Sequence, residues 1–311
     1  MIVSDSAVRD RTLAVIVLYK TKPHDSIAFR SLMESIQLLG PGSRNVTVLL
    51  FDNTPGAEPC ADRAGNVRYH ASPSNEGVAG AYAYALGLAQ VEGFTWLLTL
   101  DQDTHLPPEF LLKMGAAAVR LQVDQGVSAI VPQLSHAGRL LSPMRMRPWG
   151  VSYVKPGIQG FPKGEIHAIN SASLFRVRAL FAMGGFDPRF WLDFQDHYIF
   201  LRLHRLGMRV WVAGEVQVEH DLSLISDQQS LGPDRYRNFL LAESAFCDLY
   251  GGRVGHWALS GRLAARWWRQ RKHGAAAAIQ ELTIRALGRR LFRSRMQRIR
   301  EWEGEVERRF S

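Results

Sequence analysis

The strongest constraint on the fold is an alternation, over the first 133 residues, between continuous apolar segments and segments with apolar residues at helical spacing. Continuous apolar segments of this length are typical of strands buried on both faces of a sheet. Repeated strand–helix units of this kind predict an α/β fold with a mostly parallel sheet flanked by helices. The predicted strands are 13–19, 45–53, 96–103 and 127–133, and the predicted helices are 26–39, 77–90 and 108–122.

The second half of the chain has a weaker pattern. Residues 134–163 are rich in Gly and Pro, which predicts loops with a short strand or two. The chain from about residue 236 to the end is predicted to be helical. Between them we expect strands at 167–177, 208–214 and 216–220, and a turn leading into a helix within 184–207.

Composition limits the class of protein. The 311 residues suffice for one large or two modest domains, and 46% of them are hydrophobic, as in a globular protein. No apolar run approaches the roughly 18 residues of a membrane-spanning helix, and the first residues lack the apolar core of a secretory signal. The two cysteines, Cys60 and Cys247, are far apart in the sequence, which indicates a reducing compartment. We therefore expect a cytoplasmic protein.

The positive charge is concentrated at one end. The formal net charge is +9, and residues 253–311 alone hold 15 Lys and Arg against 5 Asp and Glu. The rest of the chain is therefore close to neutral. Such an asymmetry concerns binding partners rather than the fold.

One predicted strand, in the segment FTWLLTLDQDTHLPPEF, ends in two aspartates, Asp101 and Asp103. A carboxylate inside a buried strand is costly, whereas one just past the strand's carboxyl end is not. In open α/β sheets that edge is where ligands bind. Two such acids can also simply solvate a loop, so the remaining motifs must decide.

Several common nucleotide-site and hydrolase motifs are missing. The chain contains neither G-x-G-x-x-G nor G-x-x-x-x-G-K-[ST], and neither H-E-x-x-H nor G-x-S-x-G. What remains is a set of acids and one histidine at predicted strand ends or in the loops after them. Hard oxygen ligands of this kind suit Mg²⁺ or Mn²⁺ together with substrate phosphates. The set comprises Asp52, Asp101, Asp103, Asp193, Asp196 and His220.

An ordered series of motifs resembles the family 2 glycosyltransferases of the GT-A fold, and within them the rhamnosyltransferase-type enzymes. The resemblance covers roughly residues 12–250. An acceptor segment, beginning NSASLF, has two acids before a helix. The other matching motifs, in order, are VIVLY, LLFDN, NEGVAGA, LTLDQD, VEHD and DRYRNFLL.

This resemblance implies roles for individual residues. Asp52 would accept a hydrogen bond from the nucleotide base, favouring uracil or thymine, and Asp101 would hold the ribose or the metal. Asp103 and His220 would ligate Mg²⁺ or Mn²⁺, which stabilises the departing nucleoside diphosphate. Further contacts to the nucleotide sugar would come from Tyr19, Asn75, Gly77 and Arg237.

The family inverts the configuration of the transferred sugar, so it needs a general base on the acceptor side. Asp196 is our first choice and Asp193 the second. Three residues apart on a helix, the two would share a face. Alternatively, Asp193 caps that helix and Asp196 favours its positive end.

The sequence also departs from the family pattern at three positions. Lys20 and Ala83 stand where an Asn is common, and Gln195 replaces an acid often found before the base. These changes leave the donor sugar open. No Q-x-x-R-W occurs, which favours transfer of a single sugar over processive synthesis.

The basic end of the chain places Trp, Leu, Ile and Phe among arginines at roughly helical spacing. Such helices commonly lie on anionic membranes, which would suit a lipid-linked acceptor. The same stripe could instead pack on the catalytic domain or pair two subunits. No recognised nucleic-acid motif accompanies it, so we expect no nucleic-acid partner.

Taken together, we expect a GT-A catalytic domain at 12–235 and a basic helical extension at 236–311. The expected reaction is transfer of L-rhamnose from dTDP-L-rhamnose to a glycan or lipid-linked acceptor, with a UDP-hexose as the second choice of donor. A nucleotidyltransferase would want a Gly-rich loop after the first strand, which LYKTKPHDS lacks. A non-catalytic nucleotide-sugar-binding membrane adaptor would not need Asp196. The expected location is cytoplasmic, with peripheral contact to the inner leaflet of the plasma membrane.

Overall fold

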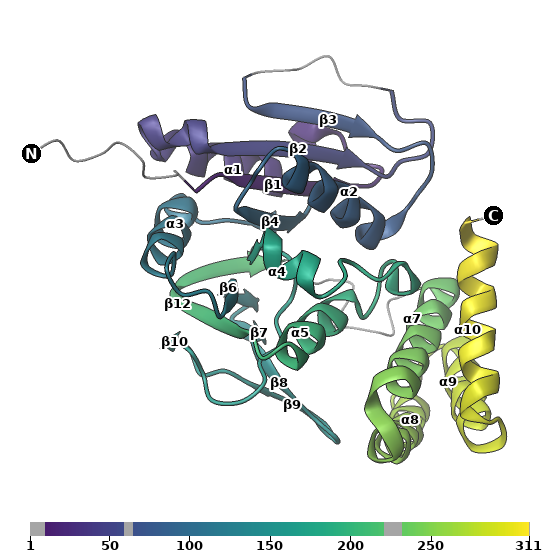
Figure 1. Cartoon of the computed structure of the whole chain (residues 1–311). Coiled ribbons are helices and arrows are strands. Elements are labelled where there is room, and N and C mark those ends of the chain that lie inside the picture. The colour runs from purple at the N-terminus through teal and green to yellow at the C-terminus, as the bar shows by residue number, and fades with distance from the viewer. Residues whose placement is uncertain (1–9, 59–64, 221–231, 311) are drawn as a thin grey trace, which may run out of the picture.

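A computed structural model describes residues 10–58, 65–220 and 232–310; Cys60 lies outside them. A ten-stranded sheet runs through the middle of the molecule (Figure 1). Its main path has the order β10-β12-β6-β11-β4-β1-β2-β3, with β5 paired to β12 and β7 paired to β6. The strands are β1 Thr12–Leu18, β2 Val46–Asp52, β3 Val67–Ala71, β4 Trp96–Asp101, β5 Thr104–His105, β6 Val127–His136, β7 Arg139–Ser142, β10 Gln159–Gly160, β11 Ser173–Arg176 and β12 Arg209–His220.

The sheet is mostly parallel, as the sequence predicts. β1 pairs in parallel with β2 and β4, β2 with β3, and β6 with β12. The short β11 is antiparallel to both of its neighbours, β4 and β6. The carboxyl ends of β1, β2 and β4 therefore meet at one edge.

Helices cover both faces of the sheet. The side chains of β1 alternate: Leu13, Val15 and Val17 pack against one set of helices, and Ala14, Ile16 and Leu18 against the other. Both sets are fully or almost fully buried, which explains the continuous apolar pattern of the strand. One face bears α2 Gly77–Val91, α4 Val177–Ala182 and α5 Gln195–Arg205, and the other bears α1 Ile27–Leu38 and α3 Phe110–Arg120.

Three predicted strands differ from the observed ones. The segment 167–177 is a strand only over its last residues, in β11. The two strands expected at 208–214 and 216–220 form one strand, β12, with a register shift between Ala213 and Gln217. Gly214 lies at that shift, and a Cβ there would be 2.2 Å from the Ile158 carbonyl oxygen, so it marks a close approach rather than a break.

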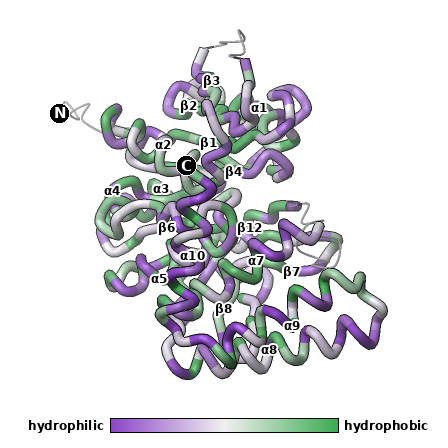
Figure 2. The backbone as a smooth tube through the Cα atoms, turned by 90° about the vertical axis from the view of Figure 1, so that its right-hand side faces the viewer, coloured by the Kyte–Doolittle hydropathy of each residue, from purple (hydrophilic) through white to green (hydrophobic). Residues whose placement is uncertain are grey.

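Four helices form the C-terminal region, which confirms the predicted helical extension (Figure 2). Trp302 of the last helix joins one of the two cores that flank the sheet, so this region packs on the sheet-containing part of the chain. A β8–β9 hairpin, Met144–Arg147 and Gly150–Tyr153, lies below the sheet (Figure 1). Across the described residues, no helix is both long and apolar enough to cross a membrane. The four helices are α7 Pro233–Phe246, α8 Gly252–Lys272, α9 Ala277–Phe292 and α10 Arg295–Phe310, with a π-helical turn, Cys247–Gly251, after α7.

Candidate active site at the carboxyl edge of the sheet

The two aspartates and the late histidine come together at the end of β4. β12 runs back along the sheet so that His220 pairs with Thr104, one residue beyond Asp103. The His220 ring lies 3.7 Å from an Asp101 oxygen through Nε2 and 3.6 Å from an Asp103 oxygen through Nδ1. One ligand atom from each of the three residues lies within 4.8 Å of the others. Two carboxylates and an imidazole at this spacing fit a divalent cation.

Neighbouring side chains hold this group in place. Thr104 Oγ1 lies 3.0 Å from His220 Nδ1 and 2.5 Å from the Ser171 hydroxyl, which also accepts a hydrogen bond from the Asp101 backbone at 2.9 Å. The Tyr82 hydroxyl donates to Asp101 at 3.2 Å. Burial and the charge of Asp101 hold the pKa of Tyr82 well above its usual value, so Tyr82 stays a hydrogen-bond donor. Sequence reasoning missed these three residues, because hydroxyls in predicted strands and helices carry no distinguishing pattern.

Tyr19 and Asp52 lie at the carboxyl ends of β1 and β2. Asp52 accepts hydrogen bonds from the Thr54 backbone at 2.8 Å and from the Tyr69 hydroxyl at 2.6 Å. The Tyr19 side chain is 41% exposed, and its backbone donates to Gln102, between the two metal-site aspartates. Tyr19 therefore borders the Asp101–Asp103 turn, whereas Asp52 lies one strand further away, because β1 separates β2 from β4.

The N-E-G segment is built against Trp191. Gly77 has φ 69°, and a Cβ there would lie 2.2 Å from the Trp191 carbonyl oxygen, so only glycine fits. Asn75 accepts a hydrogen bond from the Gly77 backbone at 3.0 Å. Asn53, next to Asp52, donates to the Gly77 carbonyl at 2.9 Å. These contacts link the predicted donor segment to the segment that leads to Asp193 and Asp196.

The two candidate bases lie in different environments. α5 begins at Gln195, so Asp196 lies in its first turn, whereas Asp193 precedes the left-handed residue Phe194, φ 65°. The expected shared helical face is therefore absent. The N-cap residue is Phe194, and no side chain caps the helix, so the capping alternative for Asp193 is wrong.

The protonation equilibrium of Asp196 is strongly shifted. Burial, and then the negative charge of Asp101, raise its pKa to about 8, although a hydrogen bond with the Asn170 backbone opposes the rise. Asp193 instead forms a bidentate ion pair with Arg235 on α7, one arm of which is 2.7 Å long. The buried Asn170 side chain forms no hydrogen bond within the described residues, which leaves an amide beside Asp196 for a ligand.

The C-terminal helices bring arginines to this edge, but not the one that was expected. Arg237 forms a bidentate ion pair with Glu305 of α10, at 2.9 and 3.0 Å. Arg235, two residues earlier, is the one that contacts a site acid. At the end of α10, Arg309 lies 3.5 Å above the Trp191 ring and donates to the Asn75 carbonyl at 3.4 Å. The R-Y-x-x-R-N-like motif could have suggested Arg235, whereas Arg309 has no signal in the sequence.

Comparison with known proteins identifies the class. The crystal structure of GalNAc-T7 with UDP, GalNAc and Mn²⁺ has a TM-score of 0.52 and 13% identity over 80% of this chain, which spans about half (52%) of that chain. The crystal structure of S. aureus TarS 1-349 covers 89% of this chain and 90% of that chain, with a TM-score of 0.49 and 13% identity. No curated protein matches the sequence. The fold is that of the GT-A glycosyltransferases.

The family assignment is narrower than the fold. Residues 29–181 match the family described as Glycosyl transferase family 2, which confirms the resemblance to family 2 glycosyltransferases indicated by the motifs. This part of the chain, just under half of it, is therefore similar to the family 2 glycosyltransferases. It includes the two metal-site aspartates and the N-E-G segment, while Asp193, Asp196 and His220 lie beyond it.

Proposed function

We propose that the protein is an inverting, metal-dependent glycosyltransferase that moves a single sugar, L-rhamnose from dTDP-L-rhamnose, onto a hydroxyl of a glycan or lipid-linked saccharide. Residues 12–235 would form the catalytic domain and 236–311 a basic helical extension. The observation that carries the proposal is the convergence of Asp101, Asp103 and His220 beside an acid, Asp196, whose pKa is raised.

On the donor side, Asp52 would accept the N3–H of thymine or uracil, since its two hydrogen bonds leave carboxylate lone pairs unused. Tyr19, Asn75 and Gly77 would line the nucleotide sugar beside it. A donor role for Arg237 would require its ion pair with Glu305 to open.

Asp101, Asp103 and His220 would hold Mg²⁺ or Mn²⁺. When bound, the ion would neutralise charge that develops on the leaving diphosphate. A hydrogen bond from His220 Nδ1 to Thr104 would fix the ring and leave the Nε2 lone pair facing Asp101.

On the acceptor side, the Asp196 carboxylate would take the proton of the attacking hydroxyl. The new bond would join that oxygen to the anomeric carbon, while the bond to the phosphate oxygen breaks and its electron pair leaves with the nucleoside diphosphate. A pKa near 8 lets the carboxylate hold a proton strongly enough to accept it during attack. Asp193, neutralised by Arg235, would position the acceptor loop rather than act as the base.

A UDP-hexose is the second candidate donor. The structure of GalNAc-T7, which shares this fold, was obtained with UDP, GalNAc and Mn²⁺, and Asp52 would accept from uracil as readily as from thymine. A non-catalytic nucleotide-sugar-binding adaptor is less favoured, because it gives no role to a partly buried acid with a raised pKa beside the proposed metal site.

We also propose a location and a partner. The protein would be cytoplasmic and would meet a lipid-linked acceptor at the inner leaflet of the plasma membrane through its C-terminal helices, which hold the excess positive charge. Pairing of two subunits through the same helices is the alternative that the oligomeric state would test.

The direct test is to measure binding and slow hydrolysis of a panel of nucleotide sugars by the wild type and Asp103→Ala, with Mn²⁺, Mg²⁺ or EDTA. The proposal expects metal-dependent selection of dTDP-rhamnose, lost in the variant. Selection of a UDP-hexose would replace the donor and keep the reaction. If no nucleotide sugar binds, the proposal is wrong.

A further inference from the structure

Three tryptophans are exposed although their size usually favours burial. Trp149 lies at the tip of the β8–β9 hairpin and is 71% exposed, while Trp257 and Trp268 on α8 are 65% and 67% exposed. A group of large aromatic rings exposed to water indicates a surface that contacts a membrane or another molecule.

These three residues form one row. On a helix that turns about 100° per residue, positions 257, 261 and 268 fall within about 40° of one another. Position 261 is a glycine, and a Cβ there would lie 3.1 Å from the Trp149 ring. The hairpin thus places Trp149 in the gap on α8 between Trp257 and Trp268, and Arg262 fixes it there by donating to the Pro148 carbonyl. Two segments about a hundred residues apart in sequence build this aromatic row.

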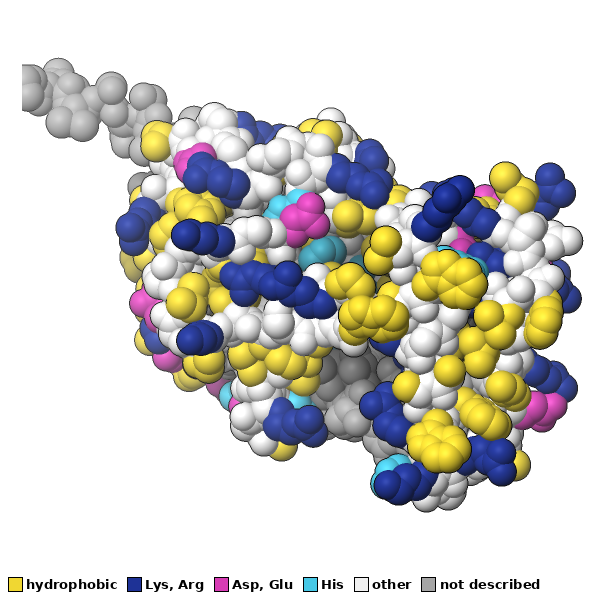
Figure 3. Space-filling view, turned by 90° about the horizontal axis from the view of Figure 1, so that it is seen from below, with side chains coloured by type: hydrophobic (Ala, Val, Ile, Leu, Met, Phe, Trp, Pro, Cys, Tyr) yellow, Lys and Arg dark blue, Asp and Glu magenta, His cyan; other side chains and the backbone are white. Residues whose placement is uncertain are grey.

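Cations border the row and acids are absent from its two elements. Neither α8 nor the β8–β9 hairpin contains an Asp or Glu. Arg253, Arg271 and Lys272 are exposed, fall within about 60° of the row on the helix, and form no ion pair with any described residue. Figure 3 shows hydrophobic and basic side chains interspersed over the right-hand part of this side, where acidic ones are few.

On the opposite face of α8, the arginine side chains form ion pairs within the protein. Arg262 and Arg266 point toward α7, where both pair with the mostly buried Glu243. The inward cations are therefore neutralised within the protein, and the outward ones are not. An outward face with rings and uncompensated cations matches the interfacial zone of an anionic bilayer, where tryptophan and basic side chains are both favourable.

We propose that the aromatic row of Trp149, Trp257 and Trp268, with its flanking cations, docks the protein on an anionic lipid surface, in a role that rests on the proposed transfer to a lipid-linked acceptor. The site is composite, because the hairpin of the catalytic half supplies the middle ring. Removing residues 253–311 would therefore leave part of the surface behind, whereas single substitutions test it directly.

The test is co-sedimentation of the full chain with vesicles of phosphatidylcholine alone or with about 30% phosphatidylglycerol, at low and high salt, since exposed charges are screened within roughly 10 Å at 0.1 M salt. Binding is expected only to the anionic vesicles and should weaken with salt. Two double variants should each weaken binding to the anionic vesicles about tenfold or more: Trp257→Ser/Trp268→Ser and Arg253→Glu/Arg271→Glu. The single variant Trp149→Ser should weaken binding by a smaller factor.

Matched controls change equally exposed positions elsewhere. Val91→Ser/Val123→Ser removes apolar groups that are 87% and 86% exposed, and Arg44→Glu/Arg178→Glu makes the same charge change; neither should affect binding. Unchanged vesicle binding by the tryptophan variants overturns the proposal. The proposal is also overturned if the wild type does not bind vesicles but binds DNA or RNA, or if it forms a dimer that the tryptophan variants lose. Donor hydrolysis without vesicles separates the two proposals: the tryptophan variants should keep it, and its absence in the wild type contradicts the function alone.

Discussion

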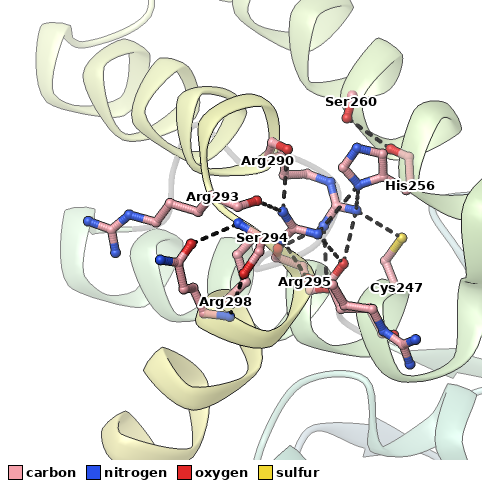
Figure 4. Close-up of polar contacts among 11 residues, drawn as sticks. Cys247, His256, Ser260, Arg290, Arg293, Ser294, Arg295 and Arg298 are labelled. Carbon is pink, nitrogen blue, oxygen red and sulfur yellow. Dashed lines mark hydrogen bonds and ion pairs between the residues drawn. The ribbon is translucent and has the colours of Figure 1, made fainter.

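The carboxyl edge of the sheet and the junction of the C-terminal helices both gather charge, but in opposite ways. At the edge, the side chains of Asp101 and Asp103 are 33% and 40% exposed and face a histidine. At the junction, Arg290 and Arg298 come close together from neighbouring helices (Figure 4). Their side chains are 0% and 6% exposed, and both form ion pairs with Asp248, which is 2% exposed. The two aspartates at the edge repel one another, whereas the single aspartate at the junction, Asp248, accepts a bidentate pair of hydrogen bonds from Arg298 and one hydrogen bond from Arg290.

The difference separates function from structure. Compensated buried charges fix how helices pack, because removing one partner strands the other. Partly exposed carboxylates gathered around one histidine at a strand end are typical of a site that binds a ligand. Arg235, which crosses from α7 to Asp193, connects the two regions.

The sharpest test of the site at the carboxyl edge is Asp196→Asn. Because Asp196 is the proposed base, this change should lower turnover about 10²- to 10⁴-fold with little change in donor binding. The wild-type rate should rise with pH as Asp196, whose pKa is raised chiefly by burial, ionises, because only the ionised carboxyl accepts a proton. Pre-steady-state transfer and a pH–rate profile measure both. An equal loss in Asp193→Asn, with Asp196→Asn active, would reverse the assignment.

The same variant should be more stable than the wild type. The raised pKa means that native Asp196 holds a proton between its ordinary value of 3.8 and about 8 while the unfolded chain has released it, so wild-type stability falls as pH rises through this window. The advantage of Asp196→Asn should therefore grow from pH 4 to 8, with an upper limit of about 6 kcal/mol set by the four-unit shift, and then level off. Urea unfolding in EDTA measures it, and a pH-independent difference would contradict the shift.

In the compensated region, Asp248→Asn should leave two buried arginines without their acid. We expect a loss of about 3–5 kcal/mol in the free energy of unfolding, since breaking a buried ion pair on one side is strongly destabilising. The control is Glu281→Gln, which removes an exposed pair with Arg285, 57% and 66% exposed, and should cost about 0–1 kcal/mol. Similar losses of unfolding free energy in the two variants would mean that the buried ion pairs of Asp248 contribute no more to stability than an exposed pair.

The contact between the two regions is tested by Arg235→Ala against Arg237→Ala. Both arginines lie on α7 in bidentate ion pairs, but only Arg235 reaches a site acid. We expect Arg235→Ala to lower kcat roughly tenfold, with a coupling to Asp193→Asn of about 1–2 kcal/mol in a double-mutant cycle. Arg237→Ala should change kcat less than about twofold. A larger effect of Arg237→Ala on donor KM would instead support the donor role implied by its motif.

Features of the fold and the site could be predicted from the sequence where they depend on residues close together in the chain, and not where they depend on contacts between distant segments. The buried strands and the D-x-D turn depend on local patterns, which the sequence shows directly. The order of the motifs grouped Asp101, Asp103 and His220 as one predicted site, and the structure brings these three residues together. A strand is predicted around β11, but its antiparallel direction has no local signal, and neither does the half-buried edge strand β3. The expected helical face shared by Asp193 and Asp196 is absent because Phe194 is left-handed. The contacts of Arg235 and Arg309 join segments that only the tertiary packing brings together.

The smallest expected effect concerns Arg309, where the basic region reaches the donor side. Its guanidinium lies on Trp191 and close enough to Tyr19 to interact with it electrostatically, so an anionic donor would gain from it modestly. Arg309→Ala should raise donor KM about 2- to 5-fold with kcat unchanged, because an exposed cation contributes about 0.5–1 kcal/mol. The neighbouring Arg308, which pairs with Glu305 at 2.7 Å, provides the control, and Arg308→Ala should leave KM unaltered. Equal effects of the two variants would mean that the basic region acts through its overall charge; an effect of Arg309→Ala alone, weakened by salt, would place its last helix in the donor site.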